Sequence, residues 1–462
     1  MVKKKLQFIF TIIFCVIISS LNAQILKRKA SLGIYIKPIQ NKDLSISYGI
    51  DSIEGILVTG VHEKSTSHLL GLKKGDLILE INQQKVKNYN TVYNVIKSHV
   101  SGDSVEVRFI RNGDTKTSKG YFVGRPFEER RNAKVLYDEV TYYNGTLRTI
   151  IAYPTNTYKD KFPVIFLIQG YGCDSYDNLT NTSNVSKVID GFLSKGYAVV
   201  RTQKPNIGDS KCKIDCKDLD FYQEVDAFQA SFDALNKYSF IDKNEIYILG
   251  LSMGGVIAPM IQQNKLKAKG IVVFGTVSRP WFEYFIDQYR RQNILLGQDF
   301  VENEQGVDNI LKFYYDFMIN KKSPIELYKN SKYRNILKYS WGNIGDNMYL
   351  NGRHAKYWQS LQDIRPYKRW KDCSSYVLSL WGEGDFVAFS KEDHVMISKV
   401  VNTYHPNHAT YLTVPFTDHS FTKVSNQKES IKYWNNYKYK RDNYNPIIVE
   451  LINRWTFSLP RR

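Results

Sequence analysis

Residues 246–255 have the sequence IYILGLSMGG and continue into VIAPM, and this stretch is the most diagnostic of the fold. Its first half is an apolar run of the length of a buried strand, and the residues after Ser252 suit a helix. Glycines at positions 250, 254 and 255 surround the serine. A sharp strand-to-helix turn requires them, because the neighbouring backbone leaves no room for side chains. The pattern predicts a strained turn at Ser252, and an idle serine in a glycine-rich turn is the alternative.

Short apolar runs recur through the second part of the chain and alternate with helical segments. They cover residues 164–168, 197–200, 246–249, 270–274 and 376–380. This alternation predicts a mostly parallel sheet with both faces covered, in the α/β class. About a hundred residues separate Phe274 from Tyr376, too many for a simple crossover. We expect packed helices there, forming a cap at about residues 278–370 over the serine.

A serine hydroxyl becomes a nucleophile when a histidine takes its proton and a carboxylate orients that histidine. Asp385 follows the predicted strand 376–380 and is the expected acid. His419 follows the last predicted strand, residues 411–415, and is the expected base. Together with Ser252 these residues form a candidate catalytic triad.

Several neighbouring residues compete for these roles. Glu383 is the main rival of Asp385, and Asp393 lies on the helix expected next. Asp418 is adjacent to His419, and adjacent side chains seldom face each other well enough for the required hydrogen bond. The remaining histidines of this region precede the last strand and are expected at the surface: His394, His405 and His408.

From about Lys134 to the end, these residues resemble the α/β-hydrolase superfamily, and more narrowly its exported bacterial esterases related to dienelactone hydrolases. The resemblance implies a serine hydrolase that cleaves small-molecule carboxylic esters through an acyl-enzyme intermediate, without a cofactor or a metal. The loop KPNIGDS, residues 204–210, resembles the superfamily's loop after the fourth strand, which shapes the pocket.

The tetrahedral intermediate of such a reaction needs hydrogen-bond donors for its negative charge. One is expected from the backbone amide of Met253, directly after the nucleophile. The other is expected from the amide of Tyr171 in the sequence QGYG, residues 169–172. Gln169 stands where a histidine is common in this superfamily, which leaves the backbone donor intact.

Residues 30–123 follow a different pattern. The sequences SLGI at 31–34, GILV at 55–58 and GLKKGDLIL at 71–79 resemble a bacterial PDZ domain. The resemblance implies a small β-rich domain whose loop at Leu32, Gly33 and Ile34 binds a protein C-terminus or an extended peptide. The alternative is a groove filled by the protein's own linker or cap. Residues 124–133 are the expected linker and residues 134–462 the expected hydrolase domain.

The N-terminus has the layout of a signal peptide. Lys3, Lys4 and Lys5 precede an apolar stretch from Leu6 to Ile18, and Ala23 suits cleavage. The apolar stretch is short for a membrane span. We expect removal of residues 1–23, export to the periplasm or the medium, and no membrane span in the mature chain.

The composition, with 43% hydrophobic and 14% aromatic residues, excludes a disordered chain. The net charge is +19, but the basic residues are scattered, so we expect a solvated basic surface and no nucleic-acid partner. The C-terminal run YWNNYKYKR, residues 433–441, interleaves aromatic and cationic residues. We interpret it as a tyrosine-rich surface segment.

Four cysteines follow the expected signal peptide: Cys173, Cys212, Cys216 and Cys373. In the superfamily that the chain resembles, the loops after the third and fourth strands lie side by side. We therefore expect a disulfide from Cys173 to Cys212 or Cys216, with Cys216 favoured. A zinc site is not expected, because no second closely spaced pair of ligands lies near Cys212 and Cys216.

Two other functions stay open. A serine peptidase of the prolyl-oligopeptidase-like type would use the same candidate triad, but those enzymes carry a gating domain that a PDZ unit would not replace. A binding protein could instead use the PDZ-like domain and carry an inactive hydrolase domain. The complete candidate triad argues against this last alternative.

Overall fold

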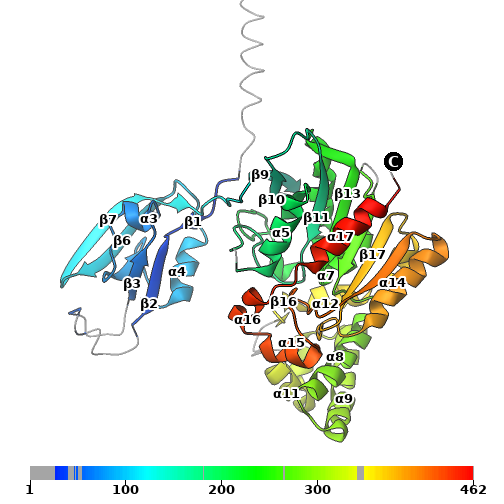
Figure 1. Cartoon of the computed structure of the whole chain (residues 1–462). Coiled ribbons are helices and arrows are strands. Elements are labelled where there is room, and N and C mark those ends of the chain that lie inside the picture. Colours follow the sequence, from blue (N-terminus) through cyan, green and yellow to red (C-terminus); the bar gives the residue numbers. More distant parts are fainter. Residues whose placement is uncertain are drawn as a thin grey trace, which may run out of the picture. The chain divides into compact units, whose positions relative to one another are not determined.

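The computed structural model describes residues 26–39, 46, 48, 49, 55–180, 182–263, 266–340 and 348–460. The chain divides into two compact units, Met1–Pro126 and Phe127–Arg462 (Figure 1). The expected signal peptide, residues 1–23, lies outside the described residues. Among the helices that are described, none is long and apolar enough to span a membrane.

The described residues of the first unit form an antiparallel sheet with two short helices, α3 (Thr66–Leu69) and α4 (Tyr89–Ile96). Its strands follow the order β2-β3-β4-β6-β7, and β5 pairs with β4. Their bounds are β2 (Ile34–Pro38), β3 (Ile56–Val61), β4 (Leu77–Ile81), β5 (Gln84–Lys85), β6 (Ser104–Arg111) and β7 (Asp114–Tyr121). A separate pair joins β1 (Ala30–Ser31) to β8 (Val123–Gly124).

Buried and outward-facing side chains alternate along β6, which explains why this segment forms a strand of the sheet. Val105, Val107 and Phe109 are buried in the core of the unit, whereas Arg108 points outward and pairs with Glu80. The pattern has the two-residue period of a strand with one covered face.

The second unit contains an eight-stranded sheet with the order β18-β17-β14-β13-β11-β12-β10-β9. Strands β11, β12, β13, β14, β17 and β18 pair in parallel. At one edge of the sheet, β10 pairs with β12 and β9 pairs with β10, both in antiparallel. Their bounds are β9 (Ala133–Tyr142), β10 (Gly145–Pro154), β11 (Phe162–Ile168), β12 (Ala198–Thr202), β13 (Ile241–Leu251), β14 (Gly270–Phe274), β17 (Tyr376–Gly382) and β18 (Ala409–Val414). The mostly parallel sheet expected from the sequence is confirmed.

Helices cover both faces of this sheet, as alternate residues of β11 show. Phe166 faces the core that includes α6 (Phe221–Ala234), α7 (Met253–Ile257) and α14 (Lys391–Tyr404). Leu167 faces the opposite core, beneath α5 (Asn184–Ser194) and α17 (Ile447–Ser458). Apolar side chains on both faces explain why the buried strands appear in the sequence as continuous apolar runs.

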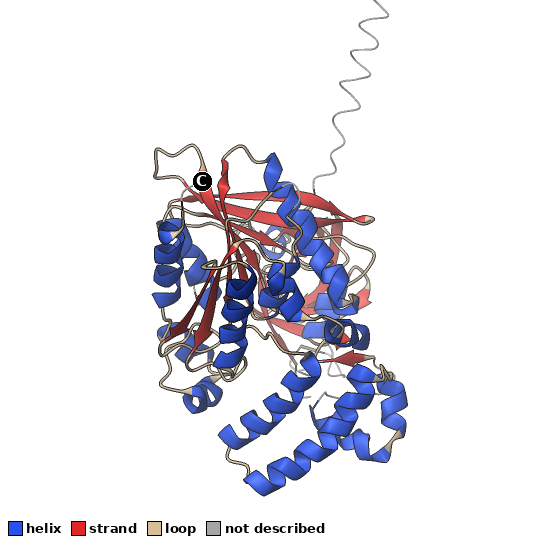
Figure 2. Ribbon diagram, turned by 90° about the vertical axis from the view of Figure 1, so that its right-hand side faces the viewer, coloured by secondary structure: helices blue, strands red, loops and turns tan. Residues whose placement is uncertain are grey.

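Between β14 and β17 the chain forms a helical insertion, residues 275–375. Figure 2 shows its helices as a group at one end of the sheet. They are α8 (Trp281–Leu295), α9 (Phe300–Tyr314), the π-helical turn η4 (Tyr315–Ile319), α10 (Pro324–Lys329), α11 (Ser331–Ser340), α12 (Ala355–Gln362) and α13 (Pro366–Lys371). A short pair, β15 (Tyr349–Leu350) and β16 (Arg353–His354), precedes α12.

The boundary between the two units falls after Pro126, within the stretch expected as a linker. Glu128, directly beyond it, is buried in the second unit and accepts hydrogen bonds at 2.8 and 2.9 Å from the Arg201 guanidinium. Arg130 binds the same carboxylate at 2.5 Å. The residues after Phe127 therefore pack as part of the second unit.

Candidate active site

Ser252 lies in the turn between β13 and α7, in a strained conformation with φ 54° and ψ −119°. A Cβ atom at position 254 would lie 2.1 Å from the Ile168 carbonyl oxygen, and one at position 250 would lie 2.5 Å from the Gly254 carbonyl oxygen. Real side chains cannot approach that closely, so both positions require glycine. The serine is held as expected for a nucleophile elbow.

Asp385 and His419 come together at the adjacent strand ends. His419 Nδ1 lies 2.8 Å from Asp385 Oδ2. The other carboxylate oxygen, Oδ1, accepts hydrogen bonds from the backbone amides of Val387 and Ala388, each at 2.8 Å. Asp385 is completely buried, so its orientation is fixed from both sides.

The protonation of His419 follows from this contact. Burial alone would lower the pKa of the imidazole, but the charge and hydrogen bond of Asp385 outweigh it and raise the pKa above its ordinary value. The pair therefore stabilises a proton on His419.

Gly275 connects this pair to Ser252. It follows β14 with φ +61°, and a Cβ there would lie 2.8 Å from His419 Nδ1 and 2.9 Å from Asp385 Oδ2. The preceding residue, Phe274, accepts a hydrogen bond from the Ser252 amide at 2.9 Å. Ser252 and the His419–Asp385 pair thus lie against consecutive residues at the end of β14. Gly275 was not singled out from the sequence, although a glycine directly after an apolar strand is a detectable signal.

The rival acids have other partners. Glu383 is exposed and accepts from the Phe416 amide at 3.3 Å. Asp393 pairs with Arg279 at 3.0 Å. Asp418 shapes its own loop, because its carboxylate accepts from the amides of Ser420 and Thr422, both at 2.8 Å.

One expectation about the histidines is wrong. His394 was expected at the surface but is completely buried on α14, where its Nε2 accepts a hydrogen bond from the Thr276 amide at 3.1 Å. Burial lowers the pKa of His394 to about 4, which keeps the ring neutral. A histidine on a helix usually faces solvent, but the α14 face that carries His394 packs inward.

The two expected oxyanion donors lie beside the serine. A Cβ at Gly170 would lie 3.4 Å from Ser252 Cβ, which places the loop after β11 directly against Ser252. Within the described part of the chain, neither the Met253 amide nor the Tyr171 amide donates to another protein group.

A buried charged cluster behind this loop was missed by the sequence analysis. It consists of Lys204, Glu224 and Arg353, each at most 1% exposed. Burial lowers the pKa of Lys204 to about 8, against the opposing attraction of Glu224. Lys204 lies two residues after the end of the buried strand β12, and Glu224 lies among the apolar residues of α6. Arg353, deep in the insertion, carries no comparable sequence signal.

The helical insertion contacts the loops on both sides of the site. On α8, the Tyr284 hydroxyl donates to the Val387 carbonyl and the Gln292 amide group donates to the Phe386 carbonyl, both at 3.1 Å. On α12, the Trp358 ring lies 5.7 Å from the ring of Tyr171.

The C-terminal tyrosine-rich segment also reaches this region. The Trp434 ring lies 6.3 Å from the His419 ring, and Lys440 Nζ lies 3.8 Å from the centre of the Trp434 ring. The segment is therefore both partly exposed and adjacent to the candidate base.

The expected disulfide is confirmed between Cys173 and Cys216, whose Cα atoms are 5.9 Å apart. It joins the loop after β11 to the loop after β12, close to the expected oxyanion donor. Cys212 and Cys373 are free thiols.

In the first unit, the expected carboxylate loop leads into edge strand β2. Gly33 has φ +64°, and a Cβ there would lie 2.3 Å from Ser65 Cβ. The Gly33 carbonyl accepts from the His62 amide at 2.9 Å and the Leu32 carbonyl from the Ser67 amide at 3.0 Å. Leu32 is buried, and Ile34 begins β2.

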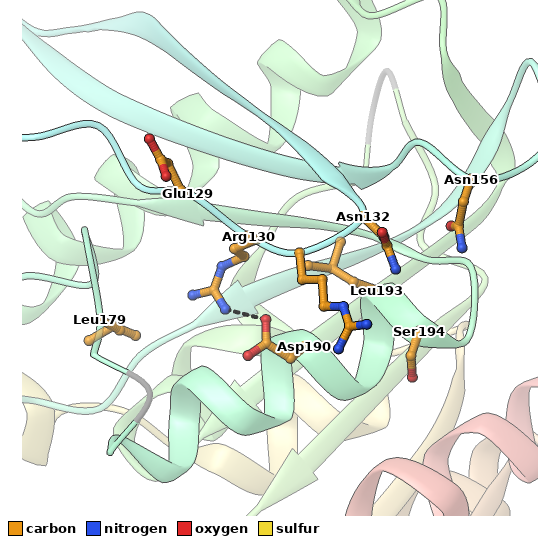
Figure 3. Close-up of a pocket in the computed structure, with 9 residues that line it drawn as sticks. Glu129, Arg130, Asn132, Asn156, Leu179, Asp190, Leu193 and Ser194 are labelled. Carbon is orange, nitrogen blue, oxygen red and sulfur yellow. Dashed lines mark hydrogen bonds and ion pairs between the residues drawn. The ribbon is translucent and has the colours of Figure 1, made fainter.

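A cavity of about 560 Å³ lies elsewhere in the second unit, between residues 129–132 and α5 (Figure 3). Arg130 and Asp190 form an ion pair of 2.5 Å in its wall. None of the sequence-predicted site residues lines this cavity.

The sheet order and the turn at Ser252 define the second unit as an α/β-hydrolase. The chain belongs to the family described as X-Pro dipeptidyl-peptidase (S15 family), whose model matches residues 145–377. That match includes Ser252 and ends before Asp385. Residues 30–119 match the PDZ domain model, so a PDZ domain precedes the hydrolase.

Among curated proteins, the PDZ region is similar to two described as "Probable periplasmic serine endoprotease DegP-like". The one from Marinomonas sp. (strain MWYL1) is 28% identical over 111 residues, which is 24% of this chain and 24% of that protein. The one from Pseudomonas putida (strain F1) is 34% identical over 82 residues, 18% of this chain and 17% of that protein. The chain thus spans only about a quarter or less of these relatives.

Among solved structures, Est1E from Butyrivibrio proteoclasticus is similar with a TM-score of 0.41 and 16% identity, covering 70% of this chain and 97% of that one. The acylaminoacyl peptidase of Pyrococcus horikoshii is similar with a TM-score of 0.42 and 10% identity, covering 87% of this chain and 52% of that one.

Proposed function

We propose that this hydrolase is a serine hydrolase that cleaves carboxylic esters through an acyl-enzyme intermediate at Ser252. The observation that supports it most is the 2.8 Å contact between His419 and Asp385, packed on Gly275 beside the strained Ser252. Strained backbone at a serine next to a histidine that contacts a buried carboxylate is typical of an activated nucleophile.

The proposed reaction has two halves. Ser252 Oγ attacks the ester carbonyl carbon while His419 takes the hydroxyl proton, and Asp385 stabilises the resulting imidazolium. The amides of Met253 and Tyr171 bind the oxyanion. The intermediate collapses, the alcohol leaves with the proton from His419, and a water molecule then releases the acid by the same steps.

The second candidate is a serine peptidase, and the family description favours it. The same residues would serve, with His419 protonating a leaving amine instead of an alcohol. A binding protein with an inactive hydrolase domain is the third candidate. It would leave the strain at Ser252 and the contact between His419 and Asp385 unexplained.

For the first unit we propose recruitment of a protein C-terminus or an extended peptide at Leu32, Gly33 and Ile34. The support is that β2 is the terminal strand of its sheet, where a peptide can add as a further strand. The proposed location is the periplasm or the medium, because disulfides such as Cys173–Cys216 persist in oxidising compartments.

A labelling experiment tests the nucleophile. A fluorophosphonate probe should modify the full-length protein at Ser252, and Ser252→Ala should abolish both labelling and turnover. Ser194→Ala, on α5 and far from this turn in sequence, is the matched control and should behave as wild type. Labelling at another residue, or none, would contradict the proposal.

A substrate panel then separates the two enzyme candidates. Nitrophenyl esters, aminoacyl anilides and X-Pro anilides are compared by kcat/KM on wild type and Ser252→Ala. Turnover of esters alone supports the esterase, whereas efficient Ser252-dependent turnover of anilides supports the peptidase. If no substrate is turned over but the probe still labels Ser252, both specificity proposals fail.

A further inference from the structure

Three consecutive carbonyl groups of the loop after β11 are bound by buried cations. Lys204 Nζ donates to the Gly170 carbonyl at 2.6 Å and to the Gly172 carbonyl at 3.0 Å. Arg353 Nη1 donates to the carbonyl between them, that of Tyr171, at 2.6 Å. Two side chains from distant parts of the chain therefore determine how these peptide groups are oriented.

Both cations share one carboxylate, that of Glu224 on α6. Lys204 Nζ lies 2.8 Å from Glu224 Oε1, and Arg353 pairs with the other oxygen. The Arg353 guanidinium also stacks on the Tyr357 ring at 3.7 Å. Lys204 thus has two carbonyl acceptors and an ion pair with Glu224, and Arg353 is bound to the same carboxylate.

A buried charged cluster of this kind is not an efficient way to stabilise a fold. Burying three charges costs several kcal/mol per ion, and replacement by apolar residues is often neutral or stabilising. Its location suggests another role, because the peptide groups that it binds lie against Ser252, with only a 3.4 Å space between Ser252 Cβ and a Cβ at Gly170.

Peptide geometry connects the cluster to the reaction. The described peptide bonds contain no cis bond, so the Gly170 carbonyl and the Tyr171 N–H point in opposite directions within one rigid plane. Fixing the Gly170 oxygen with Lys204 therefore aims the Tyr171 N–H. A cation on the carbonyl also polarises the peptide group and strengthens its N–H as a donor.

We propose that Lys204 and Arg353, held by Glu224, are positioning residues that aim the Tyr171 amide at the oxyanion. Arg353 belongs to β16 of the helical insertion, so the insertion helps to form the oxyanion site. This inference rests on the proposed serine mechanism. It assigns these residues an effect on the transition state, because the oxyanion carries its full charge only there.

The test compares Lys204→Met and Arg353→Lys with wild type in the full-length protein. We expect kcat for a nitrophenyl ester to fall by roughly 10- to 100-fold, less than the ~10²–10³ for outright loss of a donor. KM should change by less than about twofold, because ground-state binding is retained. Affinity for phenylboronic acid, whose serine adduct is tetrahedral, should fall by the same factor as kcat.

Lys269→Met is the matched control. Lys269 is equally buried and pairs with Glu245 at 2.6 Å, but it lies at the start of β14, at the opposite end of this strand from Gly275. Its kcat and boronate affinity should equal those of wild type. Thermal unfolding of each variant identifies loss of fold, and Arg353→Lys, which keeps the charge, provides a test if Lys204→Met does not fold.

The outcomes separate the two proposals. If the fluorophosphonate probe fails to label Ser252 in wild type, the serine mechanism fails. If labelling and turnover of wild type are normal but both folded variants match Lys269→Met, the positioning role is wrong. A rise in KM with unchanged kcat would also overturn it, because the residues would then act on substrate binding.

Discussion

His419 Nδ1 lies 2.8 Å from Asp385 Oδ2, although the two residues are 34 positions apart in the chain. Each follows a different parallel strand, β18 and β17, and these strands are neighbours in the sheet. The sheet therefore brings the loops of the candidate base and the candidate acid together, and their contact has a consequence for pH dependence.

The acidic limb of the activity profile should reflect this contact. His419 accepts a proton only when neutral, so kcat/KM falls as the pH drops through its pKa. Asp385 raises that pKa above the ordinary value of a histidine, so we expect the midpoint of the acidic limb to lie above about pH 6.5. Asp385→Asn should move the limb to lower pH and reduce kcat by roughly 10⁴-fold. An unchanged limb in this variant would argue against the assigned acid.

The buried carboxylate of Glu128 should matter for stability. Glu128→Gln leaves Arg201 buried without a counter-charge and Arg130 with Asp190 alone, which should lower the free energy of unfolding by about 3–5 kcal/mol. Burial alone would raise the pKa of Glu128, but the two arginines lower it overall. The contribution of the Glu128 carboxylate to stability is therefore complete above about pH 4.3, the ordinary pKa of a glutamate. It is lost as the pH falls through the lower pKa of Glu128 in the folded protein.

Urea unfolding at pH 7 and at lower pH checks this expectation. The matched control is Glu129→Gln, because its exposed side chain should contribute less than about 0.5 kcal/mol. Equal stability of the two variants would show that the buried cluster is not a stabilising element.

Reduction of the Cys173–Cys216 disulfide should destabilise the protein. The bond closes a stretch of 43 residues, for which chain entropy predicts about 4 kcal/mol. Cys216→Ser should therefore lower Tm and make it independent of reductant, whereas Cys212→Ser, a free thiol, should leave both properties as in wild type. Non-reducing peptide mapping that finds Cys173 unpaired in exported protein would contradict this prediction.

Removal of the PDZ unit should leave hydrolysis of a small soluble ester nearly unchanged. The candidate triad lies wholly in the second unit, which has its own cores on both faces of its sheet. Deletion of residues 24–124 should therefore keep kcat/KM within about twofold, while binding of C-terminal peptides is lost. Thermal unfolding confirms that the truncated enzyme is folded, and a marked change in turnover by folded enzyme would instead indicate gating.

Local patterns in the sequence determined much of this protein. The glycines around Ser252, the apolar runs and the stretch GLKKGDLIL specify a turn, buried strands and a PDZ domain, because backbone sterics and burial periodicity act over a few residues. The expected positions of Asp385 and His419 followed from the strands that precede them.

Other features of the protein follow from the tertiary structure alone. In that structure Cys216 is the partner of Cys173, His394 is buried, and Lys204, Glu224 and Arg353 come together behind the loop after β11. Arg353 is 129 positions from Glu224, and no local pattern connects them. A buried charge is stable only when it has a partner of opposite charge or a hydrogen-bond partner. Which partner it has depends on the packing of the whole chain.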